Sequence, residues 1–325
     1  MRKRRADILL IVALFAAAAT ALLFGGPAAS PSQVLRAVAG GGPPEVLTIV
    51  TAVRLPRVAL ALVVGACLAL AGAALQSLLA NPLADPFLLG ISGGGAAAAT
   101  AAVAVLPVAA FALVPAVAMA GAALATGLVW WMARGPFGPS PTRMILAGVA
   151  VNAASSAAIL LVLAMAPSPR LPGVLAITMG SFASAEPAAL AWLAPYMALP
   201  AGVLLFHARD LGLLAVGEEW AASLGVELKP VRRAIFLSAA ALCGGAVAFA
   251  GVIGFVGLVT PHLCRLVWGH DPRRLLPRVA LMGATLTALG DLVAHRLLSP
   301  VELPVGVVTA VLGVPFFVAL LRRSP

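Results

Sequence analysis

The chain has 325 residues, of which 62% are hydrophobic and only 10% are charged, and its mean hydropathy is +1.09. Apolar windows of about 20 residues recur along it, which is typical of a polytopic membrane protein and excludes a soluble enzyme built on one large core. The formal net charge of +10 would indicate nucleic-acid binding in a soluble protein. In a membrane protein it has a simpler cause, because Lys and Arg accumulate in the cytoplasmic loops.

The first predicted membrane span covers Ile8–Phe24. It follows the basic cluster Arg2–Arg5, which places the amino terminus in the cytoplasm. The span lacks a convincing cleavage site, so we interpret it as a membrane helix and not as a cleaved signal peptide. Residues 25–56 then read as an external connection, with a turn at Gly40–Pro44 and a short amphipathic piece at 33–38.

Nine further spans are predicted. Five of them lie at about 57–79, 87–106, 111–133, 142–166 and 187–206, and an external loop covers 167–185. Residues 234–268 are too long for one crossing and too short for two comfortable ones, so we place a tight external turn near Gly251–Gly254 and a short eighth span interrupted by Pro261. The ninth span ends at about Ala294, and the tenth covers about Pro304–Leu321.

The expected fold is therefore all-α, with about ten transmembrane helices, both termini in the cytoplasm and one transmembrane domain over residues 1–325. Gly and Ala within the spans let helices approach closely, and Pro within or beside several spans implies broken helices. This combination favours a transporter over a membrane anchor.

The stretch Ala208–Arg233 is the longest polar segment in the middle of the chain, between two apolar runs without charge. Within it, Glu218–Val226 fits a short amphipathic helix, for which Gly225 is a plausible stop. A helix this short is not stable alone and usually needs a docking partner. The alternative is a solvated loop that only joins two membrane helices.

Short motifs are spread over nearly the whole chain. They are Arg54-Leu55-Pro56-Arg57, Gly72 to Gln76, Asn81-Pro82-Leu83-Ala84-Asp85-Pro86, Leu146-Ala147-Gly148, GEEWAASLGV within Leu214–Val226, Gly254-Phe255-Val256-Gly257-Leu258 with Pro261-His262, Glu302-Leu303-Pro304-Val305-Gly306, and Gly313-Val314-Pro315-Phe316-Phe317. Each motif alone is weak evidence. The ordered set resembles the FecCD family, the permease subunits of ABC importers for iron siderophores, haem and vitamin B12.

The resemblance implies that residues 208–233 form a coupling region, which sits in a cleft of a cytoplasmic ATPase. The chain departs from the family pattern at Gly212, where the family commonly has Asn. The residues implied as ATPase contacts are Leu214, Gly217, Glu218, Glu219, Ala222, Leu224, Gly225 and Val226.

The resemblance also implies that Arg54 and Arg57, at the external mouth of the second span, receive acidic side chains of a substrate-binding protein. The alternative is that both arginines are interfacial anchors whose stems snorkel. A third family arginine is displaced here, because the matching position is His295, followed by Arg296. A histidine at that contact would make docking sensitive to pH.

Two cytoplasmic turns match the inner gate of the family's translocation path; they contain Asn81, Pro82 and Leu83 in one and Pro141 and Thr142 in the other. The alternative is a loop defined by proline without a gating role. Asp291 is the only carboxylate well inside a predicted span. We expect it to pair with His295, which lies at helical spacing.

The chain has no Gly-rich phosphate loop, and neither of its lysines, Lys3 and Lys229, follows a glycine. ATP and Mg²⁺ are therefore expected on a separate ATPase subunit, with no cofactor on this chain. The four histidines show no metal-ligand spacing, and the three cysteines are isolated in apolar stretches. We predict no metal site and no catalytic site, and thus a transport subunit that is not an enzyme.

We predict an importer permease of the bacterial inner membrane that moves an iron chelate, either a ferric siderophore or haem, by alternating access. Vitamin B12 is the alternative substrate. The expected partners are a second permease copy, two ATPase subunits, a periplasmic or lipid-anchored binding protein and membrane lipid, but no nucleic acid. An ion-driven secondary transporter is the rival class, and Asp291 is its lone candidate ion ligand.

Overall fold

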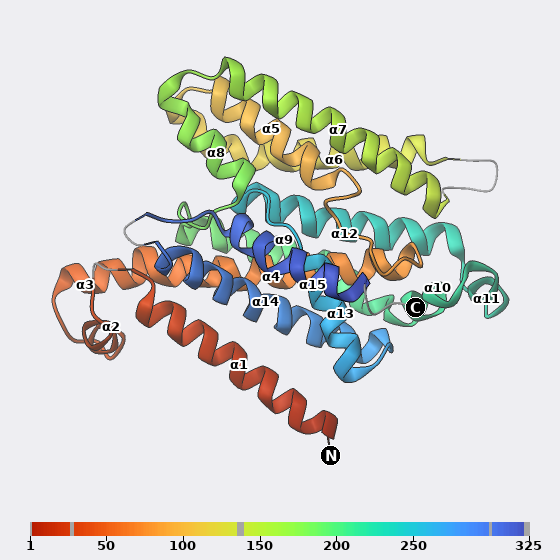
Figure 1. Cartoon of the computed structure of the whole chain (residues 1–325), viewed down its shortest axis with the longest axis horizontal. Helices are drawn as coiled ribbons and strands as arrows, with labels where there is room; N and C mark the ends of the chain where they lie inside the picture. Colours follow the sequence, from red (N-terminus) through yellow and green to blue (C-terminus); the bar gives the residue numbers. More distant parts are fainter. Residues whose placement is uncertain (1, 27–28, 135–139, 299–300, 322–325) are drawn as a thin grey trace.

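The fold is taken from a computed structural model, which describes residues 2–26, 29–134, 140–298 and 301–321. Helices account for most of these residues, and no strand occurs among them. The predicted all-α fold is therefore confirmed. Most of the helices run along the long axis of one bundle (Figure 1).

The bundle is organised around α4 (Leu55–Leu78). This helix continues α3 (Pro44–Thr48) and η1 (Ile49–Arg54), so that one apolar helix of 35 residues runs from Pro44 to Leu78. Its neighbours are α9 (Pro187–Phe206), α12 (Leu228–Ala250), α13 (Val256–Trp268) and α14 (Pro272–Arg296). Because α4 is surrounded in this way, 78% of its most apolar window is buried.

Glycine sets how closely the neighbours approach α4. A Cβ atom at Gly72 would overlap the backbone of Gly257 on α13, and a Cβ atom at Gly65 would overlap that of Gly283 on α14. Helices in a membrane gain no hydrophobic driving force from each other, so they associate through close van der Waals packing of small residues. The small residues predicted to favour a compact bundle lie at these crossings.

A second layer, uppermost in Figure 1, consists of α5 (Ile91–Val105), α6 (Val114–Met132) and α7 (Pro141–Met165). α5 contacts both α6 and α7, and α5 and α6 pack on α12. The short helix α8 (Leu171–Met179) packs against α5 and α15 (Val305–Leu321). On the opposite side of the bundle, α1 (Arg2–Phe24) crosses α14.

The two ends of the bundle differ. We call them the α10–α11 end, which carries α10 (Ala208–Val216) and α11 (Glu218–Ser223), and the α2–α3 end, which carries α2 (Pro31–Val38) and α3 (Figure 1). The start of α1 lies near the first of these ends, where Lys3 Nζ donates to the carbonyl oxygen of Trp268 at 3.0 Å. α15 runs toward the same end, so the start of α1 and the end of α15 lie toward one side, and the assignment of that side to the cytoplasm stays a prediction.

Each of the ten predicted spans coincides with a helix. Within the described part of the chain, six helices are long and apolar enough to cross a membrane, and α9 with α10, bent by 56°, would be a seventh. α5 and α15 are shorter apolar helices. α13 has 13 residues and begins after the turn predicted at Gly251–Gly254, so the short eighth span is confirmed as a helix, but the predicted interruption at Pro261 is wrong because the helix continues through that residue.

Two predicted loops are instead partly helical. The second span, predicted to begin at residue 57, belongs to a helix that starts at Pro44, because Val34, Ala37, Val46 and Val50 bury one another in a small separate core. The predicted external loop 167–185 contains α8. The N–H of Val252 donates to the carbonyl of Ile177 in α8 at 2.9 Å. These tertiary contacts outweigh the local Pro and Gly signals.

Gly72→Ala tests the importance of the α4 crossing. We expect a loss of about 1–3 kcal/mol of stability from overpacking. Gly127→Ala in α6 is the matched control, because a Cβ there meets nothing within 4 Å and alanine favours a helix by about 0.5–1 kcal/mol. Thermal unfolding of both purified variants measures the difference in stability. Equal unfolding midpoints would contradict the close contact of α4 with α13 at Gly72.

Candidate functional site

The α10–α11 hairpin is a small, firmly anchored projection. Ala208, Leu211 and Leu214 bury one side of α10, which packs against α4 and α14. Gly212 faces α14, where an added Cβ would lie 3.2 Å from Pro272 Cδ. This close contact gives a physical reason for a small residue at the position where the family commonly has Asn.

The end of α11 has a well-defined geometry. The N–H of Gly225 donates to the carbonyl of Ala222, and the N–H of Val226 donates to that of Ala221, both at 3.0 Å. Together with φ = +83° at Gly225, these bonds form a Schellman cap, which satisfies carbonyl groups that the helix leaves unpaired. The predicted helix stop at Gly225 is confirmed.

The hairpin exposes large apolar side chains. Val216, Trp220 and Leu224 are 73%, 67% and 57% exposed. An exposed apolar cluster with acidic neighbours is typical of a protein-docking surface. Trp220 was not among the predicted contact residues, although its place on the amphipathic helix is a signal that could have identified it.

The predicted coupling residues fall into three groups. Leu214 is buried and anchors α10, whereas Glu219, Ala222, Leu224 and Gly225 are exposed on the hairpin. Glu218 is ion-paired with Arg232 of α12, which ties α11 to that helix. The half-buried members of the set are Gly217, Glu218 and Val226.

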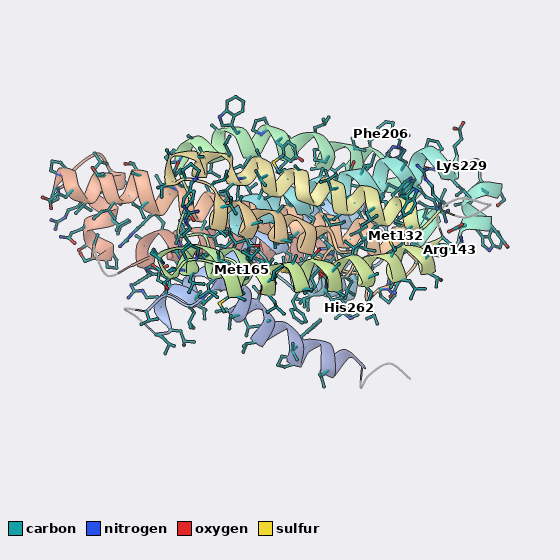
Figure 2. The ribbon with its side chains drawn as sticks, turned by 90° about the horizontal axis from the view of Figure 1, so that it is seen from above. Met132, Arg143, Met165, Phe206, Lys229 and His262 are labelled. Atoms are coloured by element: carbon teal, nitrogen blue, oxygen red, sulfur yellow. The ribbon has the colours of Figure 1, made fainter. Side chains whose placement is uncertain are left out.

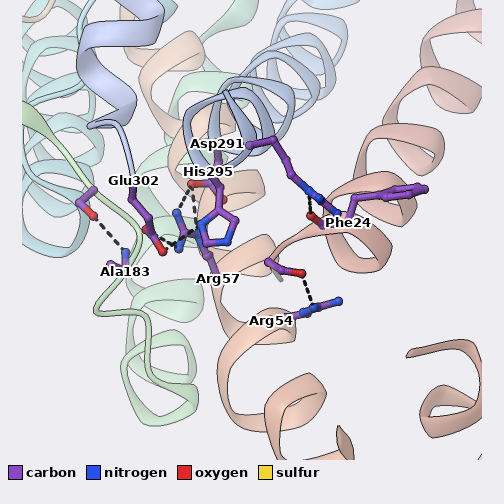
Figure 3. Close-up of polar contacts among 10 residues, drawn as sticks. Phe24, Arg54, Arg57, Ala183, Asp291, His295 and Glu302 are labelled. Carbon is purple, nitrogen blue, oxygen red and sulfur yellow. Dashed lines mark hydrogen bonds and ion pairs between the residues drawn. The ribbon is translucent and has the colours of Figure 1, made fainter. Parts of the chain in front are cut away.

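A charged cluster occupies the α2–α3 end (Figure 3). Arg57 binds both carboxylate oxygens of Asp291 through Nε and Nη2, at 2.9 Å each. Its Nη1 donates to Glu302 at 3.0 Å, and Glu302 also lies 2.9 Å from His295 Nδ1. The cluster therefore joins α4, α14 and the connection that leads to α15.

The predicted pairing of Asp291 with His295 is wrong. Asp291 pairs with Arg57, and His295 pairs with Glu302. Helical spacing brings residues 291 and 295 to one face, but a guanidinium from α4 offers the carboxylate two parallel donors, and such bidentate pairs are stronger than a single contact. Sequence alone does not reveal which residue of another helix faces Asp291.

Glu302 lies between α14 and α15, outside both helices. Partial burial disfavours its charged form, yet Arg57 and His295 together hold the pKa of this carboxyl below its usual value. Contacts that depend on the charged form are present above the ordinary pKa and are lost as the pH falls through the lowered one.

Arg54 has a different environment from Arg57. It is only 3% exposed, and its guanidinium donates to the carbonyls of Leu22, Leu23, Gly26 and Ala29 at 2.9–3.2 Å. Arg296 is exposed, and its Nε donates to the carbonyl of Phe24 at 2.6 Å. Both arginines thus bind carbonyls where α1 ends. In this arrangement the guanidinium of Arg54 faces inward, and docking at Arg54, Arg57, His295 and Arg296 stays a prediction.

The residues of the two predicted gate turns lie beside one small pocket: Asn81, Pro82 and Leu83 follow α4, whereas Pro141 and Thr142 begin α7, after residues 135–139, which lie outside the described part of the chain. Leu83 N–H donates to Asn81 Oδ1 at 2.9 Å, which closes an Asx turn directly after α4. Leu78 and Leu79, just before this turn, line a pocket together with Pro141. Pro82 and Thr142 are exposed, and Asn81, Leu83 and Pro141 are half-buried. The two turns therefore share one end of the bundle, and their gating role stays a prediction.

Asp85 is a buried carboxylate in the same turn. Its Oδ1 accepts the Phe87 N–H at 2.8 Å, and burial raises the pKa of Asp85 to about 6 although this hydrogen bond opposes the shift. No group of three or more His, Cys, Asp or Glu that could hold a metal ion occurs among the described residues. Asp85 is therefore best explained as an acceptor that shapes the turn.

Comparisons with known proteins agree with this arrangement. Residues 9–323 match the model of the FecCD transport family. The hemin transport system permease protein HmuU of Yersinia pestis is 41% identical over 281 residues, which cover 84% of this chain and 82% of the relative. The vitamin B12 import system permease protein BtuC of Vibrio vulnificus is 41% identical over 279 residues, covering 83% and 82%.

A solved structure of a metal-chelate type ABC transporter, in an inward-facing conformation, has a TM-score of 0.85. It is 30% identical and covers 99% of this chain and 100% of its own. The fold and these relatives define the class: a multi-pass membrane permease subunit of ABC importers, not an enzyme, which works with an ATPase and a substrate-binding partner. The chain belongs to the FecCD transport family.

Asp85 variants test how the gate turn is held. Asp85→Asn keeps an acceptor for the Phe87 N–H and removes a buried charge, whereas Asp85→Ala leaves the N–H unpaired. We expect the Asn variant to exceed the Ala variant in stability by about 1–3 kcal/mol.

The same variants have a pH signature. Because the folded pKa of about 6 is above the ordinary 3.8, the wild-type chain gains stability relative to Asp85→Asn as the pH falls through 6. Thermal unfolding at pH 5 and pH 7.5 measures this difference. If the unfolding midpoints of the wild type and Asp85→Asn changed equally between the two pH values, Asp85 would not be buried in this way.

Proposed function

We propose that the chain translocates an iron chelate, haem or a ferric siderophore, across the bacterial inner membrane by alternating access. Relatives named for hemin transport, for Fe(3+)-citrate import and for iron(3+)-hydroxamate import support the substrate class. The observation that carries the proposal is the exposed, anchored α10–α11 hairpin in a fold that matches an ABC permease over its whole length.

The hairpin suits the transmission of force from an ATPase. α10 contacts α4 and α14, and α11 is tied to α12 through Glu218 and Arg232. A partner that grips Trp220 and Leu224 would therefore move membrane helices and not a free loop. ATP and Mg²⁺ bind to that partner in this mechanism, and the hairpin shifts the bundle between outward and inward states.

A second copy of the chain completes the translocation path in this proposal. α15 lies at the edge of the molecule and diverges from the rest of the bundle (Figure 2). It exposes Val307, Val311, Val314 and Val318. In addition, α7 exposes Leu146, Leu160 and Leu161. These apolar faces support a permease dimer with the path between the two copies.

Vitamin B12 is the second candidate substrate. A vitamin B12 permease is as similar to this chain as the hemin permease, with 41% identity in both cases. An ion-driven mechanism is disfavoured, because the lone candidate ion ligand, Asp291, has both carboxylate oxygens occupied by Arg57.

Uptake into proteoliposomes tests the proposal. The vesicles contain the chain with the ATPase and binding protein encoded beside it, and haem, a ferric siderophore and cobalamin are compared. We expect ATP-dependent uptake of one iron chelate that requires all three components. If cobalamin were the only ligand taken up, vitamin B12 would replace the iron chelate as the proposed substrate. Uptake on an ion gradient by the chain without its ATPase and binding protein would overturn the mechanism.

Trp220→Ala tests the coupling role of the hairpin. We expect about tenfold or greater loss of ATPase co-purification, since exposed aromatic anchors dominate docking energies at about 2 kcal/mol or more. Trp192→Ala is the matched control, because Trp192 on α9 is similarly exposed, at 78% against 67%. Equal co-purification of the two variants would contradict docking at α11.

A further inference from the structure

The two carboxylates on Arg57 are not equivalent. Asp291 is 6% exposed in its side chain and binds Nε and Nη2, whereas Glu302 is 41% exposed and binds only Nη1. Buried ion pairs are hard to break, because each charge would remain desolvated and unpaired. An exposed pair is worth only about 0–1 kcal/mol, so a competing carboxylate can replace it at little net cost. Glu302 is thus the exchangeable ligand of Arg57.

Glu302 also holds the start of α15. It lies on the connection from α14, where Leu303 N–H donates to the Ala294 carbonyl and Val305 N–H to the Gly180 carbonyl, both at 3.0 Å. Beyond this point α15 contacts α8, α13 and α14, and much of its surface is exposed. The side-chain bonds from Glu302 to Arg57 and His295 therefore add two ties at the point where α15 is joined to the bundle.

From this geometry we propose that Glu302 is an internal substitute for an acidic side chain of the docking partner. A carboxylate from the substrate-binding protein takes Nη1 of Arg57, displaces Glu302 and loosens the outer end of α15. The inference rests on the proposed function and on the predicted docking of that partner at Arg57. It also gives a role to the Glu302–Gly306 motif, which lies outside the predicted coupling region and the predicted gate turns.

The electrostatics favour this exchange. Arg57 of α4 and His295 of α14 contact Asp291 and Glu302 at this end, while Arg54 and Arg296 bind carbonyls at the end of α1 close by. When a partner carboxylate takes the place of Glu302, Arg57 keeps two carboxylate ligands, so its own charge is not left unpaired. Glu302, already 41% exposed, then moves into solvent. Docking is thereby coupled to α15, which carries an apolar face of the proposed path.

Glu302→Gln tests the competition directly. The full-length permease is placed in nanodiscs with its ATPase, and the Kd of the binding protein encoded beside it is measured at fixed salt. We expect the Kd to fall about two- to fivefold, because the competing carboxylate is gone. Glu302→Asp keeps the charge and should bind like the wild type.

Glu45→Gln is the matched control for this experiment. Glu45 is an exposed acid of α3 at the same end, and it forms no ion pair with the residues that the structure describes. We expect its Kd to equal that of the wild type. If Glu302 had only a structural role, Glu302→Gln would bind the binding protein as tightly as the wild type or more weakly.

Hydrogen exchange over residues 305–312 reports the release of α15. Adding the binding protein should raise exchange in the wild type, and Glu302→Gln should show the raised level without it. Unchanged exchange on docking, or a Kd that does not fall in Glu302→Gln while wild-type uptake is normal, overturns this inference alone. Absence of both binding and uptake in the wild type overturns the proposed function and the inference with it.

Discussion

The close approach of α4 to its neighbours is the constraint on which the rest of the structure depends. Gly72 lies against Gly257 of α13, and Gly65 lies against Gly283 of α14. Gln76 reinforces the first crossing, since its Nε2 donates to the Gly257 carbonyl at 3.2 Å and its Oε1 accepts from Arg265 at 2.6 Å. A buried amide needs such partners because water cannot reach it. The two crossings fix α4 as the axis of the bundle.

α4 and α14 connect the α2–α3 end of the bundle with the α10–α11 end. α4 carries Arg57 at the α2–α3 end and leads into the gate turn at the other. α14 carries Asp291 at the first end, and its Pro272 lies against Gly212 of the hairpin at the second. Helices are stiff, and packed interfaces switch between discrete arrangements, so in the proposed mechanism a displacement of the hairpin is carried along α4 and α14 toward the α2–α3 end.

The charges at the α2–α3 end show how a membrane protein satisfies polar groups near its surface. Arg54 binds four backbone carbonyls where α1 ends, and Arg57 binds two carboxylates. Carbonyl groups at a helix end need donors when little water is present. Two arginines three residues apart thus have different partners: Arg54 binds backbone carbonyls, and Arg57 binds one buried and one exposed carboxylate.

Sequence alone determined the all-α membrane fold, the ten helical segments and the stop at Gly225, because hydropathy windows and helix caps are local properties. Only the tertiary structure decided that 44–54 and 171–179 are helical, that Arg54 faces inward, and that Asp291 binds Arg57 while Glu302 binds both Arg57 and His295. Residues 57, 291 and 302 come together only when α4 packs on α14, and Gly65 and Gly283 set that packing. A pattern along one chain indicates which side chains share a helix face, but the partner across a helix crossing depends on how closely two backbones approach.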